Sequence, residues 1–509
     1  MLTLRLRHTC CPILLAGLLT LGACAPKAPA VVTPATPAAA AAARPVSARA
    51  LPAELDRIFG APAFDRMQWG VMVQSLASGE VLYQRNASKL MMPASNMKVL
   101  TLAAAADRLG WDFTWNTRLL AAGPIEQGVL HGDLVVVGSG DPTINARGGS
   151  ALRVFERWAD LLAAAGIRRI EGRILADARA FDREGLGAGW AWDYLEASYA
   201  APVGALQFNE DVAEAVVRPG PAAGAPAVVE MRPAESGLVV DSRVVTVAGG
   251  STDVRLRRLP GSDRLTVTGQ IALAAKEVVR LTSVDSPADF FARALRSTLV
   301  GRGFEITGIA LDFERADVPP ILEGAREIFV HQSPPLAEAA RVLMKVSQNL
   351  YAETFLKTVG ARAGDGSAAG GQKVVEEVLQ SWGVPPDAYV LADGSGLSRY
   401  NYVTAETLVT VLRHLYRDEK HREAFLATLP VGGQDGGTIA RRFKGTRGEN
   451  NVRAKTGSIA HVSALSGYVT TMGGEPLVFS IIANHFTQPQ ATIDTATDLA
   501  VERLAWIRR

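Results

Sequence analysis

The chain has 509 residues, of which 48% are apolar and 20% are charged. This length predicts two or more domains, because a single hydrophobic core rarely grows so large. The formal net charge is +2, from 53 Lys and Arg against 51 Asp and Glu. This balance offers no electrostatic reason for a polyanionic partner, so we expect no nucleic-acid binding.

Residues 1–23 have the pattern of a signal peptide. Arg5 and Arg7 precede an apolar stretch over residues 13–21, which is too short to span a bilayer, since that takes roughly 20 apolar residues. The LGAC sequence that ends at Cys24 resembles the lipobox of bacterial lipoproteins. The resemblance implies cleavage before Cys24 and lipid attachment to this residue. An ordinary cleaved signal peptide is the alternative.

The cysteines of the chain are Cys10, Cys11 and Cys24, so a mature chain that begins at Cys24 keeps a single thiol. Such a protein has no internal disulfide, and its stability comes from its core. This count also excludes a cysteine nucleophile and a zinc site with several cysteine ligands. We expect no metal and no cofactor.

Residues 24–50 are rich in Ala, Pro and Val and predict a semi-extended tether between the membrane and the folded body. An amphipathic helix through Phe59 and a hairpin over residues 68–85 follow. Apolar residues at helical spacing then predict a helix from Ser95 to Leu109. We assign residues 51–118 to the first part of the main domain.

Residues 119–282 are rich in Gly, Pro and short β-branched runs, which predict a mostly β insertion with a nested β subdomain at about residues 211–270. Helical patterns return after Pro287 and include a run from Pro335 to Val359. Two apolar strands and a last helix end the chain. Residues 283–509 therefore complete the main domain, and the whole pattern indicates an α+β fold.

Three short motifs follow one another in the chain. The first is SNMK at residues 95–98, where a helix is predicted to start, so Ser95 and Lys98 share one helical face. A serine hydroxyl is a weak nucleophile until a base takes its proton, and a lysine kept neutral by burial can do so. The alternative is a solvent-exposed helix with an N-capping serine.

The second motif is SQN at residues 347–349. A hydroxyl and a carboxamide two residues apart can point to the same place if the backbone forms a turn. Ser347 could then relay a proton between Lys98 and a leaving group, and Asn349 could bind a substrate amide. An ordinary helix cap is the alternative.

The third motif is KTGS at residues 455–458, ahead of a predicted strand. Lys455 and Thr456 near an edge strand can bind a carboxylate, and Gly457 allows the backbone of an extended substrate to approach closely. A basic turn is the alternative for this motif alone. The three motifs together, in this order, favour a shared site.

This trio is the motif set of the penicillin-binding proteins and the active-serine β-lactamases. From about residue 52 to its end the chain resembles the D-alanyl-D-alanine carboxypeptidase/endopeptidase family, the class C low-molecular-mass penicillin-binding proteins. The resemblance implies a penicillin-binding/β-lactamase-like catalytic domain, an antiparallel sheet flanked by helices, with inserted, mostly β domains. The further segments that carry it are GSGDP at 138–142, APVGAL at 201–206, SQNLYAE at 347–353 and DGSGLSR at 393–399.

The resemblance also implies a serine-type hydrolase that cleaves D-alanyl peptide bonds through an acyl-enzyme. Ser95 would attack the carbonyl, Lys98 would act as general base, and Ser347 would pass a proton to the leaving amine. The microscopic identity of the base in each step stays open. Substrate binding would fall to Asn349, Lys455, Thr456, Gly457 and Ser458, the last contributing its N–H, with that of Ser95, to an oxyanion hole.

Two further residues are implied by resemblance alone. Asp177 resembles an acid of the insertion that reads the amino end of a diamino acid side chain, and Arg399 resembles its companion at the rim of that pocket. The alternative for Asp177 is a turn residue at a strand end. The chain departs from the family pattern at Gln348 and Ser458, and neither change removes a catalytic group.

The expected partners are peptidoglycan peptides, β-lactam inhibitors and, through the lipid anchor, the membrane. The expected location is the periplasmic side of the cell envelope, at the outer membrane in a Gram-negative cell. A β-lactamase is a second hypothesis, disfavoured because the chain lacks the Glu-x-x-Leu-Asn segment of class A enzymes. A catalytically silent murein-binding lipoprotein is a third, although no motif residue is missing.

Overall fold

A computed structural model describes residues 45–434 and 436–508. The predicted signal peptide, Cys24 and most of the predicted tether lie outside these residues. The last part of the predicted tether differs from the prediction. There β1 (Val46–Ser47) pairs in parallel with β24 (Ile507–Arg508), because Val46 is buried against the C-terminal part of the chain.

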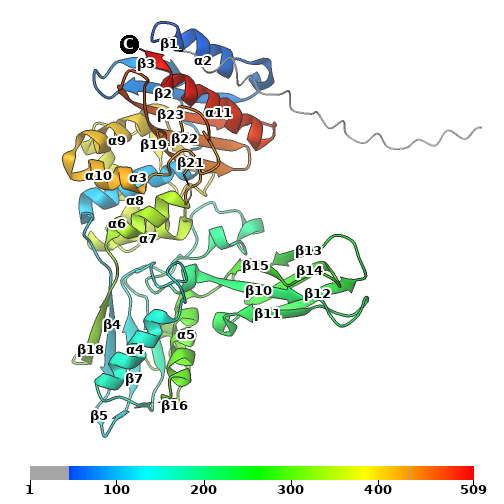
Figure 1. Ribbon diagram of the computed structural model, residues 1–509. Coiled ribbons are helices and arrows are strands. Elements are labelled where there is room, and N and C mark those ends of the chain that lie inside the picture. Colours follow the sequence, from blue (N-terminus) through cyan, green and yellow to red (C-terminus); the bar gives the residue numbers. More distant parts are fainter. Residues whose placement is uncertain (1–44, 435, 509) are drawn as a thin grey trace, which may run out of the picture. The chain divides into compact units, whose positions relative to one another are not determined.

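The main sheet is antiparallel, with five strands in the order β21-β22-β23-β2-β3, so strands from both ends of the chain lie side by side (Figure 1). Helices α2 and α11 pack on one face around apolar side chains that include Phe59 and Val501. The predicted hairpin and C-terminal strands are confirmed. These elements are α2 (Leu51–Phe59), β2 (Gln68–Ser75), β3 (Val81–Arg85), β21 (Arg453–Ile459), β22 (Val462–Thr470), β23 (Pro476–Asn484) and α11 (Gln490–Ala505).

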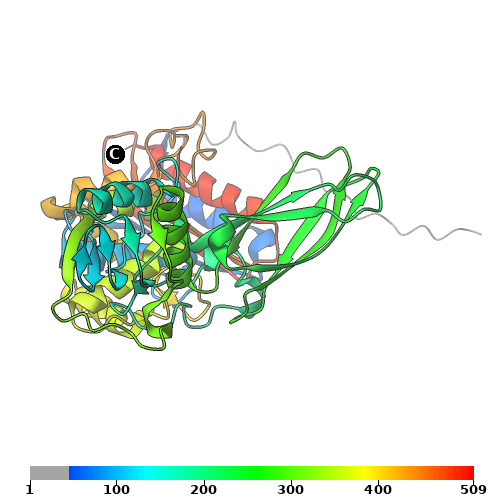
Figure 2. The same ribbon diagram turned by 90° about the horizontal axis from the view of Figure 1, so that it is seen from below.

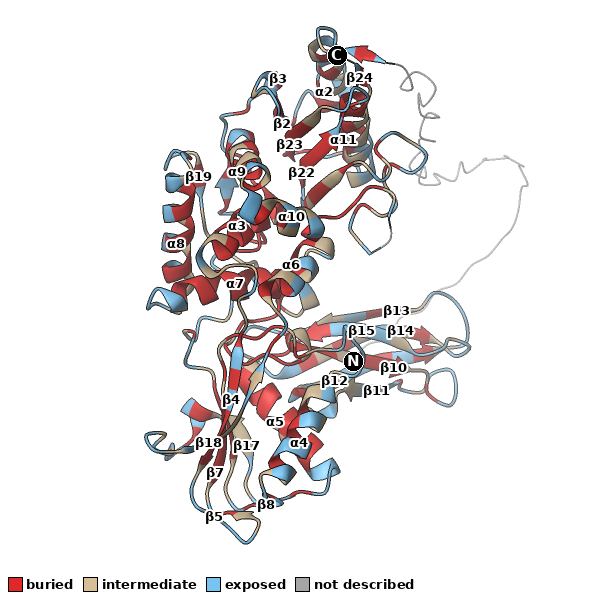
Figure 3. Cartoon of the chain, turned by 60° about the vertical axis from the view of Figure 1, so that its left-hand side comes forward, coloured by how far each residue is buried: buried red, intermediate tan, exposed pale blue. Residues whose placement is uncertain are grey.

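A layer of helices covers the other face of the main sheet, where α9 packs on β2 and β23. Helix α3 lies inside this layer against α7, α8 and α9 and is buried on nearly all sides, as expected for a helix that is apolar all round (Figure 3). The elements are α3 (Met97–Leu109), α6 (Leu336–Lys345), α7 (Asn349–Arg362), α8 (Ala368–Ser381), β19 (Tyr389–Val390), β20 (Tyr402–Val403), α9 (Ala405–Arg417) and α10 (Glu419–Thr428).

The inserted part contains a second five-stranded sheet in the order β17-β9-β7-β4-β18, whose core side is covered by α4 and α5. A small four-stranded sheet, β16-β8-β6-β5, adjoins it. The elements are β4 (Asn116–Ala122), β5 (Ile125–Glu126), β6 (Val129–Leu130), β7 (Asp133–Val137), α4 (Arg153–Ala164), β8 (Arg169–Ile170), β9 (Ile174–Asp177), α5 (Pro287–Gly301), β16 (Glu305–Ile306), β17 (Ala310–Asp312) and β18 (Arg326–Gln332).

The pairing of β18 with β4 differs from the predicted end of the insertion at residue 282. Helix α5 and strands β16, β17 and β18 all follow that residue, yet β18 pairs with β4 and α5 packs on the second sheet. The domain limits remain a prediction, and the strand pairing favours a return to the main domain near residue 332 instead of 282.

Two three-stranded sheets, β11-β10-β15 and β12-β14-β13, pack on each other around a small apolar core. They extend away from α4 and α5 in both views of the molecule (Figures 1 and 2). They lie where the nested β subdomain is predicted and continue past residue 270, since β15 pairs with β10. The strands are β10 (Val212–Arg218), β11 (Val228–Arg232), β12 (Val239–Val247), β13 (Asp253–Arg257), β14 (Arg264–Ala272) and β15 (Val278–Ser283).

Short 3-10 helices connect many of these elements. In the part of the chain that the structure describes, no helix is long and apolar enough to cross a membrane. The 3-10 helices are Pro62–Phe64, Ala94–Asn96, Trp192–Tyr194, Ser198–Ala200, Asn209–Asp211, Ala234–Ser236 and Phe313–Arg315.

Candidate active site

Ser95 lies in the 3-10 turn that leads directly into α3, and it is half-buried among buried neighbours. Strand β21 passes close to this turn. A Cβ atom on Gly457 would lie 2.6 Å from the carbonyl oxygen of Pro93 and 3.1 Å from the amide nitrogen of Ser95. Glycine is therefore required at position 457 for the strand to approach the serine so closely.

Lys98 follows one helical turn later and is fully buried. Its Nζ lies 2.9 Å from Ser95 Oγ, 2.6 Å from Asn349 Oδ1 and 2.8 Å from the carbonyl oxygen of Ser395. The last two atoms only accept hydrogen bonds, so a neutral amine donates to both and turns its lone pair toward Ser95 Oγ. The predicted contact of Ser95 and Lys98 is present.

Burial favours this neutral form. It lowers the pKa of Lys98 to about 7, although the nearby carboxylates of Asp393 and Glu353 act in the opposite direction. An amine with such a pKa can accept the proton of the serine hydroxyl at neutral pH.

The predicted helical run from Pro335 to Val359 is broken at the second motif. Ser347 has a φ of 63°, a left-handed conformation that ends α6 and allows α7 to begin at Asn349. The side chain of Gln348 caps α7 by accepting a hydrogen bond from Leu350 N. The sequence pattern could not show this break, because no Gly or Pro marks it.

Lys455 joins the second and third motifs. Its buried Nζ donates to Ser347 Oγ at 2.8 Å and to the carbonyl oxygen of Thr456 at 2.7 Å. Ser347 thus contacts Lys455, whereas a relay from Lys98 was predicted. Burial, and next the charge of Lys98, hold the pKa of Lys455 well below its usual range. An anion beside this amine would restore its positive charge.

The other residues of the third motif lie along β21. Thr456 Oγ1 lies 2.8 Å from Thr438 Oγ1, and Ser458 is exposed and pairs with Ser463 of the neighbouring strand β22. The remaining edge of β21 is bridged to Val431 at Arg453, and Ala454 N donates to the carbonyl oxygen of Pro430. In the described part of the chain no strand of the main sheet covers the rest of this edge, so the backbone beyond Ala454 is available for pairing with an extended peptide.

Asp177 and Arg399, the two residues implied by resemblance alone, have different hydrogen-bond partners. Asp177 is buried at the end of β9, where its carboxylate accepts hydrogen bonds from Arg179 Nε at 2.8 Å and Nη2 at 2.7 Å. Arg399 is exposed and donates from Nη2 to the carbonyl oxygen of Ala460, directly after β21. Among residues 45–434 and 436–508, no hydrogen bond joins Asp177 to Ser95 or to the other motif residues.

The insertion also contributes to the site, which the motifs did not indicate. The backbone carbonyl of Tyr199 accepts a hydrogen bond from Asn349 Nδ2 at 2.8 Å and so turns Asn349 Oδ1 toward Lys98. Trp190 Nε1 donates to Asp393 Oδ2 at 2.8 Å. No motif marks Tyr199, because its backbone makes the contact.

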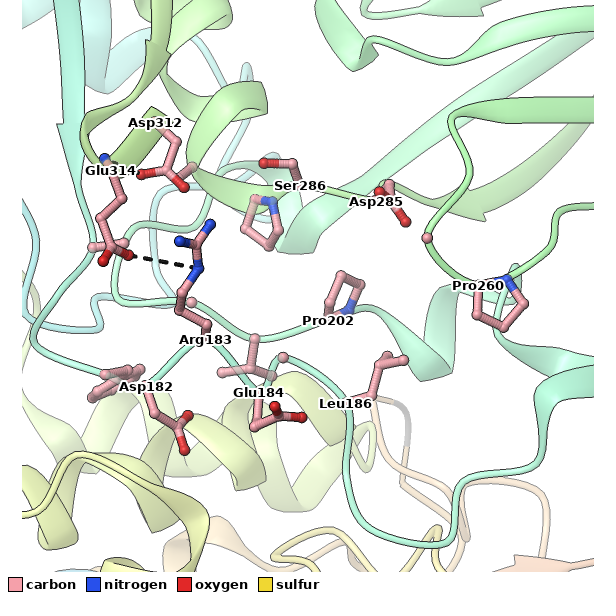
Figure 4. A pocket seen from close by; sticks show the side chains of 18 of the residues that line it. Asp182, Arg183, Glu184, Leu186, Pro202, Pro260, Asp285, Ser286, Asp312 and Glu314 are labelled. Carbon is pink, nitrogen blue, oxygen red and sulfur yellow. Dashed lines mark hydrogen bonds and ion pairs between the residues drawn. The ribbon is translucent and has the colours of Figure 1, made fainter. Parts of the chain in front are cut away.

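A pocket of about 480 Å³ lies in the inserted part, away from these motifs (Figure 4). Arg183 and Glu314 form an ion pair across it at 3.7 Å, and Arg258 and Asp285 form another at 2.9 Å. None of the three motifs lines this pocket. Across the described ranges, no cluster of three His, Cys, Asp or Glu side chains is arranged to hold a metal ion.

The arrangement as a whole suits acyl transfer. A half-buried hydroxyl lies beside a buried amine of lowered pKa, and a second buried amine lies beside another hydroxyl. Asn96 Nδ2 donates to the carbonyl oxygen of Lys455 at 3.2 Å and thereby joins the first motif to the third. Segments far apart in the chain thus converge on Ser95.

Comparisons with known proteins identify the family. The model of the D-Ala-D-Ala carboxypeptidase 3 (S13) family matches residues 51–504. A D-alanyl-D-alanine carboxypeptidase from Actinomadura sp. (strain R39) is 37% identical over 449 residues, which are 86% of this chain and 81% of the relative. One from Haemophilus influenzae is 28% identical over 82% of this chain and 85% of the relative.

Solved structures give the same result. The crystal structure of penicillin binding protein 4 from Haemophilus influenzae superposes with a TM-score of 0.77 at 26% identity and covers 89% of this chain and 99% of that one. The predicted α+β fold of the penicillin-binding type is confirmed, and so is the family resemblance. The chain belongs to the D-Ala-D-Ala carboxypeptidase 3 (S13) family.

Proposed function

We propose that this protein is a serine-type D-Ala-D-Ala carboxypeptidase with DD-endopeptidase activity, which acts on peptidoglycan stem peptides and cross-links and is inhibited by β-lactams. The observation that carries the proposal is the 2.9 Å contact between Ser95 Oγ and the buried Nζ of Lys98. Membership of the S13 family supports the substrate class.

In the proposed acylation step, neutral Lys98 takes the proton of Ser95, and Oγ attacks the carbonyl carbon of the penultimate D-alanine. The N–H groups of Ser95 and Ser458 stabilise the oxyanion, which the close approach of Gly457 to Ser95 supports. Collapse of the intermediate breaks the peptide bond, and the leaving amine takes a proton from Ser347, whose hydroxyl is bound by Lys455. The proton that Lys98 took from Ser95 then passes to Ser347, which leaves Lys98 neutral again for the second step.

Deacylation returns the enzyme to its starting state. Water attacks the ester carbon while Lys98 acts as the base, and the proton then passes back to Ser95 Oγ as the product acid leaves. The two fixed acceptors on Lys98, Asn349 Oδ1 and the Ser395 carbonyl, keep the amine pointed at the reacting atom in both steps.

The proposed substrate runs along the free edge of β21. Its terminal carboxylate binds Lys455 and Thr456, where the anion raises the lowered pKa of the buried amine. Arg399, which contacts the backbone just after β21, is proposed at the rim of the pocket for the diamino acid side chain. The role of Asp177 stays a prediction, since Arg179 already occupies its carboxylate.

We further propose export to the periplasmic side of the envelope and a lipid anchor on Cys24, supported by the LGAC sequence at residues 21–24. Growth of expressing cells with labelled palmitate tests the anchor. The wild-type protein is expected to carry the label, and a Cys24→Ala variant is expected to carry none. An unlabelled wild-type protein contradicts the anchor and leaves the hydrolase proposal intact.

Labelling with fluorescent penicillin tests the enzyme proposal. The wild-type protein is expected to form a lasting adduct and to release D-alanine from a stem peptide, whereas Ser95→Ala is expected to do neither. Ser251→Ala, which changes an exposed serine of the β subdomain, is the control and should behave as wild type. Rapid turnover of penicillin indicates a β-lactamase, and the absence of any adduct indicates a murein-binding protein.

A further inference from the structure

Glu353 is a buried carboxylate that the proposed mechanism does not use. It follows Asn349 by four residues on α7, so the two side chains leave the helix on the same face. Asn349 contacts Lys98 directly. Glu353, only 5% exposed, instead accepts hydrogen bonds from two backbone amides, Gly394 N at 2.9 Å and Ser395 N at 2.8 Å.

These two amides belong to the loop that supplies the carbonyl of Ser395 to Lys98. The Ser395–Gly396 peptide is held on its other side by Asp393, whose Oδ1 accepts from Gly396 N at 2.7 Å. In a planar trans peptide the N–H and C=O bonds point in opposite directions, so this bond turns the Ser395 oxygen toward Lys98 Nζ at 2.8 Å. Glu353 and Asp393 thus hold three consecutive peptides of one loop: Glu353 holds the first two, and Asp393 holds the third, which carries the Ser395 carbonyl.

The same carboxylates act on the charge of Lys98. Burial favours the neutral form of Lys98, whereas negative charge on Asp393 and Glu353 favours its ammonium form. Burial and the charge of Asp393 raise the pKa of Glu353. A change of charge at Glu353 therefore reaches Lys98 both through the loop and through space.

We propose that Glu353 is a positioning residue for acylation: it holds the loop so that the Ser395 carbonyl aims the Lys98 amine at Ser95. Its negative charge acts on the same amine and favours the ammonium form. This inference rests on the proposed function, in which Lys98 is the base.

The test compares Glu353→Gln with Thr101→Val. Thr101 lies one turn after Lys98 on α3, and its Oγ1 donates to the carbonyl oxygen of Gly394 at 2.7 Å, so its loss loosens the same loop without a change of charge. The measurement is the rate of acylation by fluorescent penicillin from about pH 5 to about pH 9, a range that spans the titration of a perturbed base.

Glu353→Gln is expected to lower the maximal rate on the order of tenfold, because its amide leaves one backbone N–H without an acceptor. It should also move the rise of the rate with pH about one unit lower, since loss of the negative charge disfavours the ammonium form of Lys98. Thr101→Val should lower the rate with no shift along the pH axis. The acylation rate of Glu353→Asp, which keeps the charge, should rise over the same pH range as that of the wild-type protein.

An unshifted profile for Glu353→Gln, or the same shift for Thr101→Val, overturns the inference. Failure of the proposed function gives a different result, because the wild-type protein itself then forms no penicillin adduct on Ser95. If Glu353→Gln does not fold, the amide resonances of Gly394 and Ser395 in the wild-type protein replace it. Their chemical shifts should change over the pH range in which the acylation rate rises. Chemical shifts that do not change with pH overturn the inference.

Discussion

Lys455 Nζ lies 2.8 Å from Ser347 Oγ, a contact between residues 108 positions apart in the chain. It joins the Lys-Thr-Gly motif on β21 to the turn between α6 and α7. A lysine and a serine in direct contact form one unit, in which the amine orients the hydroxyl and the hydroxyl satisfies the buried amine. Removal of either partner should therefore disable much of what the pair does.

Ser347→Ala and Lys455→Ala are each expected to slow D-alanine release. The double variant should slow it by less than the product of the two separate fold-changes. The reason is that contacting residues couple, by about 0.5 to 3 kcal/mol. A double-mutant cycle on kcat/KM with a stem peptide measures this coupling. Strict additivity would show that the two side chains act independently.

Lys98→Ala is expected to slow acylation by penicillin roughly 10² to 10⁴-fold, the contribution of a positioned general base. Lys89→Ala, which changes an exposed lysine nine residues earlier, is the matched control and should leave the rate unchanged. Rates from fluorescent penicillin labelling measure both. Near wild-type acylation in Lys98→Ala would assign the base to another residue.

The acylation rate of the wild-type enzyme is expected to depend on pH through Lys98. Burial lowers the pKa of its amine to about 7, and only the neutral amine accepts the serine proton. The rate should therefore fall about tenfold for each pH unit below the pKa and level off above it. A rate that stays constant through this range would separate acylation from the titration of Lys98.

Gly457→Ala is expected to destabilise the fold by about 1 to 3 kcal/mol and to slow acylation, because the new Cβ would lie 2.6 Å from the backbone oxygen of Pro93 and force β21 away. Gly148→Ala is the control, since a Cβ there meets no atom within 4 Å. Thermal unfolding and penicillin labelling report the two effects. Unchanged stability and acylation in Gly457→Ala would contradict the required close approach.

Local patterns in the sequence were sufficient to predict several features of the protein. Ser95 and Lys98 lie three residues apart, in the 3-10 turn and in the first turn of α3, so their contact follows from helical spacing. The hairpin over residues 68–85 and the apolar strands β22 and β23 follow from alternation and turn residues. The order of the three motifs is sufficient to indicate the family.

Only the tertiary structure decided the rest, because it depends on contacts between distant segments. Lys98 meets Asn349 across 251 residues, and its lowered pKa comes from burial, which no motif encodes. The backbone carbonyls of Ser395 and Tyr199 orient the side chains of Lys98 and Asn349. Every residue has a backbone carbonyl, so residue types do not indicate these contacts. The pairing of β18 with β4 is likewise a long-range contact, which composition cannot reveal.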